Sequence, residues 1–141
     1  MIIKQTSVFI ENRPGSLAEI TDMIAKNGIN LRALSLAETS DSGILRIITD
    51  NADTAKVEAV LKENRITGSV REVLSVLVDD RAGGLAGMLK VLAGNNIAVK
   101  YMYAFVVERE KACIIMRIGE KDIVRAAEIL ASAGYEGLAI E

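Results

Sequence analysis

Hydrophobic positions along the chain follow two spacings, one typical of strands and one typical of helices. Residues 7–11 alternate, with Val8 and Ile10 on one side and Phe9 on the other, which predicts a strand. The next apolar residues recur at intervals of three and four, which predicts an amphipathic helix. They are Leu17, Ile20, Met23 and Ile24. Gly28 ends that stripe, because glycine accepts the left-handed conformation just past a helix.

The same alternation of elements continues to the middle of the chain. Residues 29–38 and 44–49 predict a hairpin around the polar segment 39–43. A second helix is predicted from apolar residues on one face, and Gly68 leads from it into a final strand. The residues on that face are Val57, Val60 and Leu61.

The second half of the chain repeats the first. The run from Asn12 to Ala18 is answered 68 positions later by the run from Asp80 to Ala86, and the apolar positions that follow keep that offset. After the second strand a one-residue shift aligns Val60-Leu61 with Ile129-Leu130. An internal repeat of this kind indicates two copies of one unit. The prediction is two domains, residues 1–70 and 71–141, with the seam near 70–73.

The repeat predicts the elements of the second half. Residues 70–78 contain no turn signal, so the last strand of the first half is expected to continue into the first strand of the second. A helix follows, then a hairpin through 98–107 and 112–118, a helix over 122–133 and a last strand at 138–140. The residues of the first of these helices that face the core are Leu85, Met88, Leu89 and Leu92.

The order strand-helix-strand-strand-helix-strand defines the fold class. It is the ferredoxin-like α+β plan, an antiparallel sheet with both helices on one face. Two tandem copies are predicted, and each leaves its second sheet face available for packing. A domain of about 70 residues buries modest area alone, so the halves are expected to pair.

Composition and charge remove several classes of function. Of the 141 residues, 50% are hydrophobic, and the net charge of -2 with a pI near 5.3 provides no basic field for nucleic acid. No apolar run approaches the roughly 18 residues of a membrane span, and the N-terminus lacks signal-peptide features. A single cysteine does not indicate secretion. A cytoplasmic protein that binds neither nucleic acid nor membrane is expected.

The residue types that are missing argue against catalysis. The sequence has no histidine, which excludes a Ser-His-Asp system and histidine-based acid–base chemistry. A zinc site would need carboxylates and one thiolate, an unusual set, and Cys113 lies in an apolar run that predicts a buried, structural thiol. Gly83-Gly84 is not followed by Gly-Lys-Ser/Thr, so a Walker-type nucleotide loop is rejected. No cofactor, metal or enzyme activity is expected, and a small enzyme using Lys or Asp is the least favoured alternative.

The segment from Asn12 to Leu17 carries the candidate chemistry. A strand ends, Gly15 permits a tight turn, and a helix begins whose first N–H groups are free to bind a carboxylate. Ser16 and Glu19 have the spacing of a capping box. The alternative is a plain strand-to-helix turn, in which glycine and Pro14 serve the backbone conformation only.

This segment resembles a known family. Glu-Asn-Arg-Pro-Gly-Ser-Leu at 11–17, an apolar helix and Asn-Gly-Ile-Asn at 27–30 resemble the ACT domain, a small-molecule-binding regulatory module of amino-acid biosynthetic enzymes such as 3-phosphoglycerate dehydrogenase and aspartokinase. The resemblance covers both halves and is denser in the first. It implies side-by-side pairing of two domains. It also implies an effector, usually an amino acid, bound between the turn after the first strand and the start of a second strand, often from the neighbouring domain.

The resemblance also implies particular residues. Asn12 matches the ligand-binding asparagine, Asn30 matches the one that closes the site, and Gly15 matches the turn glycine. The dehydrogenase pattern has a histidine where this chain has Ile10. The full set of implied ligand-binding positions, both halves together, is Asn12, Arg13, Gly15, Ser16, Leu17, Asn30, Asp80, Arg81, Gly83, Gly84, Leu85 and Ala98.

The two halves differ at the matched positions, since the second half has Asp80 and Ala98 where the first has asparagines. If turn and strand pair across domains, one site combines Asp80 with Asn30 and the other combines Asn12 with Ala98. The first is the better receptor by hypothesis, with Asp80 taking the ammonium group and the backbone at 83–85 taking the carboxylate. Arg13 and Arg81 are either carboxylate clamps or solvated turn residues.

The expected function is therefore regulatory and non-catalytic. The chain is expected to bind an amino acid or similar small effector between two ACT-like domains and to act through a homo-oligomer or a regulated protein. The alternative is a protein-interaction or oligomerisation module with vestigial pockets. In that case Tyr101 and Tyr103, on one face of their predicted strand, are candidate anchors, although they serve equally as packing residues.

Overall fold

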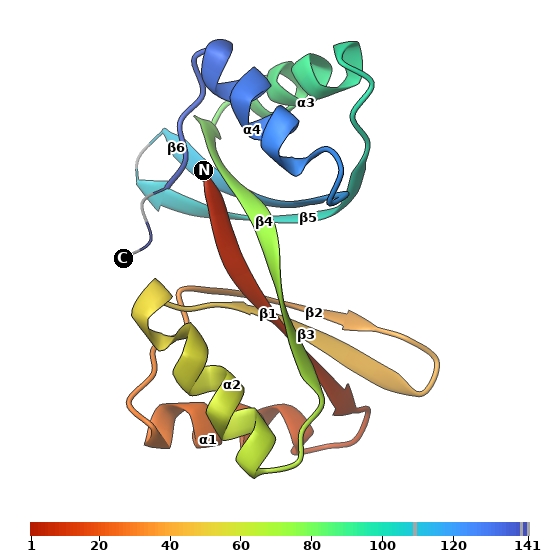
Figure 1. Ribbon diagram of the computed structural model, residues 1–141, viewed down its shortest axis with the longest axis vertical. Helices are drawn as coiled ribbons and strands as arrows, with labels where there is room; N and C mark the ends of the chain where they lie inside the picture. The colour runs from red at the N-terminus through yellow and green to blue at the C-terminus, as the bar shows by residue number, and fades with distance from the viewer. Residues whose placement is uncertain (109, 139, 141) are drawn as a thin grey trace. The chain divides into compact units, whose positions relative to one another are not determined.

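The computed structural model describes residues 1–108, 110–138 and 140, and these form six strands and four helices (Figure 1). The elements are β1 (Ile2–Glu11), α1 (Ser16–Lys26), β2 (Ala33–Glu38), β3 (Ser42–Ile48), α2 (Thr54–Glu63), β4 (Gly68–Asp79), α3 (Gly84–Gly94), β5 (Val99–Glu108), β6 (Lys111–Ile118) and α4 (Ile123–Ser132), with a 3-10 turn, η1 (Asn51–Asp53), before α2. The predicted ferredoxin-like α+β class with two tandem copies is confirmed.

The chain divides into two compact units that exchange short terminal segments. The N-terminal unit consists of Lys4–Arg71 together with Ile140–Glu141, and the C-terminal unit consists of Glu72–Ala139 together with Met1–Ile3. Asn51 Nδ2 donates to the Ile140 carbonyl oxygen at 2.7 Å in the first unit, and Ser75 N donates to the Met1 carbonyl oxygen at 2.8 Å in the second. Each unit is therefore completed by the opposite end of the chain.

The sheet of the N-terminal unit is antiparallel and has the strand order β2-β3-β1. The chain entering β4 lies on the other side of β1, where Phe9 N donates to the Thr67 carbonyl oxygen at 2.9 Å. Helices α1 and α2 cover one face of this sheet (Figure 1). The alternation seen in the sequence places the strand residues Val8 and Leu45 in the core with Ile24 of α1, all three fully buried.

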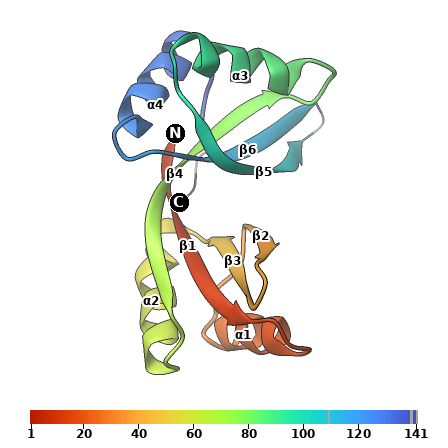
Figure 2. The ribbon, with the colours of Figure 1, turned by 90° about the vertical axis from the view of Figure 1, so that its right-hand side faces the viewer.

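The C-terminal unit repeats this arrangement with β4, β6 and β5 in antiparallel order. Helices α3 and α4 lie together on one face of its sheet (Figure 2). The core between the layers is apolar on both sides, with Val76 and Met116 from the strands and Met88 and Leu130 from the helices all fully buried. Apolar burial of this kind stabilises by about 25 cal/mol per Å² removed from water.

Strand β4 bears out the expectation that no turn separates the halves. It is continuous over Gly68–Asp79 and includes the residues at which one unit ends and the other begins. Its burial changes along its length: the residues from 68 to 72 are exposed or half-buried, whereas those from Val73 to Val76 are buried. One strand therefore contributes residues to both units.

The predicted last strand at 138–140 is wrong for the residues that the structure describes there. Leu138 and Ile140 are not in a strand, and residue 139 lies outside the described residues. Glu136 still accepts a hydrogen bond from Leu77 N at 2.8 Å, but Leu138 N turns to the Ser75 hydroxyl at 3.1 Å. Met1–Ile3 supplies the neighbouring backbone in that unit, so the C-terminal segment is not needed as a full strand.

Two further details differ from the sequence-based expectation. β1 begins at Ile2, five residues before the predicted strand, and β2 begins at Ala33, so residues 29–32 precede it. Cys113, by contrast, is fully buried on β6 as predicted. Burial raises the pKa of its thiol, an effect that the Ser75 hydroxyl 3.5 Å away partly offsets.

Candidate functional site

The turn between β1 and α1 is shaped by a glycine in the left-handed region. Gly15 has φ of +89° and occupies the position before the helix, which begins at Ser16. The predicted capping box of Ser16 and Glu19 is therefore wrong, because Ser16 is already helical and no side chain caps the helix. The first intrahelical bond runs from Glu19 N to the Gly15 carbonyl oxygen at 2.9 Å. The amides of residues 17 and 18 precede it and have no intrahelical acceptor.

Arg13 is held by two carboxylates at the surface of this turn. Its Nε lies 3.0 Å from Glu11 Oε2, and its two terminal nitrogens donate to Glu19 at 2.8 and 3.3 Å. The hydrogen bonds from Arg13 lower the pKa of the Glu19 carboxyl group, and the pKa of Arg13 is raised in turn. The guanidinium thus links the β1–α1 turn to Glu19 at the start of α1, and its donors are directed at these carboxylates and not at a ligand.

Asn12 forms a hydrogen bond between the turn and the end of β2. Its Nδ2 donates to Glu38 Oε1 at 3.3 Å, which leaves the Asn12 Oδ1 as an acceptor. Glu38 is paired in register with Gly43 across the β2–β3 hairpin. The asparagine singled out by the sequence therefore stands beside an exposed carboxylate at the mouth of a hollow.

That hollow has a volume of about 170 Å³ and lies between the turn, the start of α1 and the β2–β3 hairpin. It brings together four of the sequence-predicted positions, which are Asn12, Arg13, Ser16 and Leu17. Ser16 is only 5% exposed, and its hydroxyl has no hydrogen-bond partner among the described residues although it lines the hollow. Leu17 and Leu36, at 36% and 51% exposure, supply an apolar wall.

The equivalent turn of the C-terminal unit is closed more tightly. Gly83 has φ of +86°, and a Cβ on Gly84 would overlap the carbonyl oxygen of Asp79. The Gly84 amide donates to the Arg81 carbonyl oxygen at 3.0 Å, and Asp80 N donates to the Glu110 carbonyl oxygen at 2.7 Å. The exposed side chain of Asp80 projects from this fixed backbone.

Asp79 carries the ion pairs of that turn. Its carboxylate lies 2.8 Å from Lys111 Nζ and 3.4 Å from Arg81 Nε. The hydrogen bond from Lys111 lowers the pKa of Asp79, and the pKa of Lys111 is raised by the same contact. Arg81 is thus engaged by its neighbour much as Arg13 is engaged in the first turn. The charges of the turn are largely balanced within it.

Within one unit the two asparagine-type positions lie at opposite ends of the sheet. Asn12 follows β1 next to the end of β2, whereas the exposed Asn30 precedes the start of β2. The six residues of β2 separate them by roughly 20 Å. Asp80 and the exposed Ala98 are separated in the same way, since β5 pairs with β6 from Val99↔Ile118 to Glu108↔Lys111. A small ligand cannot span either pair inside a single unit.

Sequence reasoning missed the hairpin side of the first hollow, which is formed by Leu36, Glu38, Ser42 and Gly43. The alternation of apolar residues on β2 could have indicated this side of the hollow. Leu34 and Leu36 lie on the same sheet face as buried core residues of β3, yet both are about half exposed. Tyr101 and Tyr103 are half-buried on β5 opposite Arg117 and Ile115, as the two-residue period predicts.

The described residues contain no group of three or more side chains suited to holding a metal ion. Of the helices that the structure describes, none is both long and apolar enough to cross a membrane.

Comparison with known proteins identifies the family. The model of the ACT domain pair matches residues 1–136, so the chain belongs to the ACT domain pair family, whose domains are regulatory. No curated protein matches by sequence.

Solved structures agree with this fold. Protein BT0572 from Bacteroides thetaiotaomicron is 34% identical, with a TM-score of 0.89, and the match covers 99% of this chain and 93% of that one. The ligand-free regulatory subunit of aspartate kinase from Thermus thermophilus is 13% identical, with a TM-score of 0.66 and coverage of 94% and 97%. Aspartokinase III from E. coli, in complex with lysine and aspartate, is 17% identical, with a TM-score of 0.54, and the match covers 93% of this chain but 32% of that one.

Proposed function

We propose that this chain is a non-catalytic regulatory module that binds an amino acid at the strand-to-helix turns of its two units. The observation that carries the proposal is the hollow behind Asn12, because it is lined by the motif residues and by the Ser16 hydroxyl, which has no hydrogen-bond partner in the described part of the chain. Membership of the ACT domain pair family supports it, as does the complex of aspartokinase III with lysine and aspartate. We place its action in the cytoplasm, where a lone thiol stays reduced.

The groups around the first turn suit the two ends of an amino acid. The free amides at the start of α1 and the Ser16 hydroxyl are donors for a carboxylate. Glu38 and the Asn12 Oδ1 are acceptors for an ammonium group at the same opening. Charge-assisted hydrogen bonds contribute about 1.5–3 kcal/mol each, so two or three suffice for micromolar affinity.

The second half of each site must come from elsewhere, because Asn12 and Asn30 lie too far apart in their own unit. We propose that each turn is completed by the segment before β2 or β5 of another unit, so that Asp80 acts with Asn30, and Asn12 with Ala98. In the better of these two sites Asp80 binds the ammonium group, and the carboxylate lies at Gly83, Gly84 and Leu85. Since the Gly84 amide already donates to Arg81, the Leu85 amide is the principal donor.

One observation favours an oligomerisation module as the second candidate. The edge strands carry exposed apolar residues, Leu34 and Leu36 on β2 and Met102 and Val106 on β5, between 41% and 65% exposed. Edge strands with such side chains are sites of pairing with another chain. A homo-oligomer or a regulated protein is the partner of this second function.

A thermal-shift screen of the full chain against the twenty amino acids tests the proposal. A ligand at 100 times its dissociation constant adds about 2.7 kcal/mol, a shift of several degrees. The shift should be selective. It should be reduced in Asn12→Ala, which alters the hollow of the first turn, and in Asp80→Ala or Asn30→Ala, which alter the second site, but kept in Asp41→Ala, an exposed control in the β2–β3 loop. If no amino acid shifts the protein, the binding proposal fails, and association measured by light scattering then tests the second candidate.

A further inference from the structure

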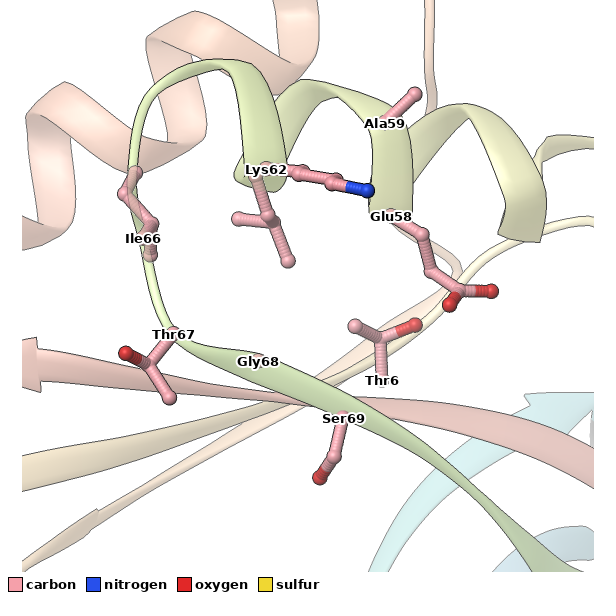
Figure 3. Close-up of a pocket in the computed structure, with 9 residues that line it drawn as sticks. Thr6, Glu58, Ala59, Lys62, Ile66, Thr67, Gly68 and Ser69 are labelled. Carbon is pink, nitrogen blue, oxygen red and sulfur yellow. The ribbon is translucent and has the colours of Figure 1, made fainter.

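A second hollow, larger than the first, lies in the N-terminal unit between α2 and the start of β4 (Figure 3). Its volume is about 370 Å³, within the range of small-molecule sites. It shares no residue with the hollow behind Asn12. Its lining combines two opposite charges, the Thr6 hydroxyl and an apolar floor, and each of these indicates a property of the ligand.

The hydroxyl of Thr6 is the most informative polar group. Thr6 is only 3% exposed and lines the hollow from β1, yet its side chain has no hydrogen-bond partner among the described residues. Among the described residues, every side-chain nitrogen or oxygen that is fully enclosed has a hydrogen-bond partner. The Thr6 hydroxyl has none in the described part of the chain, so it is not fully enclosed and faces the hollow. Thr67 and Ser69 border the hollow from the β4 side, but their hydroxyls point away from α2, so Thr6 supplies the inward hydroxyl (Figure 3). A buried hydroxyl left open in this way favours a polar occupant.

Two opposite charges border the hollow on α2. Glu58 and Lys62 lie one helical turn apart; the Glu58 carboxylate lies between the helix and the strands, and the Lys62 side chain runs along the helix (Figure 3). Neither forms an ion pair within the described ranges, with the other or with any third residue. A ligand that carries an ammonium and a carboxylate group a few ångströms apart complements this pair.

The floor of the hollow is apolar. Leu61 is 3% exposed and Ile66 is half-buried beneath the charges. Gly68 lets β4 run against this floor, since a Cβ there would lie 2.9 Å from Leu61 Cδ1 and 3.1 Å from the Ser7 carbonyl oxygen. An apolar side chain on the ligand would be buried against Leu61 and Ile66.

The C-terminal unit shows that the fold does not require these polar residues. The internal repeat places Leu74, Ala127 and Ala131 at the positions of Thr6, Glu58 and Lys62. There, Met1 lies against Gly137, whose Cβ would be 2.7 Å from the Met1 Cα, and Met1 and Ile2 pack on the apolar core. The polar residues of the hollow are therefore specific to the N-terminal unit, and the fold shared by the two units does not require them.

From these features we infer that the hollow between α2 and β4 binds a small zwitterion with an apolar side chain, an apolar α-amino acid. Its ammonium group binds Glu58, its carboxylate binds Lys62 and the Thr6 hydroxyl, and its side chain lies on Leu61 and Ile66. This site is separate from the turn site of the proposed function. The chain then holds two classes of amino-acid site in one unit.

Amide NMR spectra of the full chain, titrated with L-leucine, test the inference. Saturating shifts are expected at the amides of Lys62, Gly68 and Ser69. 4-Methylpentanoate and isoamylamine, which each keep one of the two charges, should bind at least about tenfold more weakly, since each loses one charge-assisted contact. Lys62→Gln and Glu58→Gln should weaken L-leucine to the same degree. Glu63→Gln, an exposed neighbour on α2 that does not line the hollow, should leave it unchanged.

Three outcomes overturn the inference. One is that no shift occurs at these amides with millimolar L-leucine, L-valine, L-methionine or L-alanine. Another is equal binding of an analogue that lacks one charge. The last is unchanged affinity in both charge variants. In the same spectra, a shift of the Leu17 amide reports binding at the turn site. Ser16→Ala should change the Leu17 shift and leave the shifts at Lys62, Gly68 and Ser69 as they are. Failure of one site is therefore distinguishable from failure of the other.

Discussion

Gly84 begins α3 directly against the carbonyl of Asp79, so that a side chain of any size at this position would overlap the carbonyl oxygen. The corresponding residue of the first turn is Ser16, whose side chain lines an open hollow. Two copies of one motif thus differ at their tightest point. In the first turn, a hollow remains beside Ser16. In the second turn, the start of α3 lies directly against the Asp79 carbonyl at the end of β4.

Gly84→Ala should destabilise the protein by about 2 kcal/mol or more, because the backbone of β4 or the start of α3 must move to relieve the overlap. Urea unfolding measures the change. Gly87→Ala in the same helix is the control: its Cβ meets only the Tyr135 hydroxyl at 3.7 Å, so it should stabilise by about 0.5–1 kcal/mol. Equal midpoints for the two variants would contradict the close approach.

Arg13→Gln should return the pKa of Glu19 toward its ordinary value of about 4.3, since the hydrogen bonds of Arg13 lower it. A carboxylate with a lowered pKa stabilises the folded state above its unfolded pKa, and that stabilisation is lost as the pH falls through the folded pKa. The difference in melting temperature between wild type and variant should therefore be present at pH 7 and shrink in acid. Carboxyl NMR titration follows Glu19 directly.

Arg32→Gln is the matched control for that titration, because Arg32 pairs with Asp50 at 3.5 Å, outside the β1–α1 turn. Its effect on the Glu19 titration should be negligible. A Glu19 curve that is unchanged in Arg13→Gln would show that the clamp seen at 2.8 Å does not persist in solution.

Cys113 should be unreactive in the folded protein, since it is fully buried and burial raises its thiol pKa. Reaction with a disulfide reagent at pH 8 should be at least about a hundredfold slower in buffer than in concentrated urea, because attack requires the core to open. Rapid labelling of the native protein, with its circular dichroism unchanged, would contradict this burial.

Ile2→Ala should destabilise the C-terminal unit although Ile2 is about 70 residues from the rest of that unit in sequence, because Ile2 packs against that unit's core. Loss of about 1 kcal/mol is expected for a partly buried side chain. Hydrogen exchange should accelerate at Val76 and Met116 and stay unchanged at Ile24. Ile20→Ala, in the core of the N-terminal unit, should give the reverse pattern. Faster exchange near Ile24 in the Ile2 variant would contradict the assignment.

The sequence predicted the order of elements because the apolar spacing and the repeated Arg-x-Gly turns are local signals. Val8 and Ile10 alternate as a strand does, and Gly15 and Gly83 have the positive φ that the two turns need. The capping box failed for a local reason too. Ser16 has the right spacing to Glu19, but the glycine before it occupies the capping position and Arg13 binds Glu19 instead.

The rest depends on contacts between residues far apart in the chain. Nothing in Ile2-Ile3 distinguishes a strand that completes the second unit from one that completes the first. The hollow beside α2 was also invisible, because Glu58 and Lys62 have the spacing of an ordinary surface pair. It becomes evident only when Thr6 is found buried beneath them without a partner in the described chain.

The exchange of Met1–Ile3 and Ile140 gives the molecule an interlaced chain path. A protease that cut β4 at the boundary between Arg71 and Glu72 would not release two self-sufficient pieces. Each fragment would keep one short segment that belongs to the other, so the fragments should stay associated or reassemble when mixed. Expression of either repeat alone, cut at the same boundary, would for the same reason lack a short segment that its unit needs.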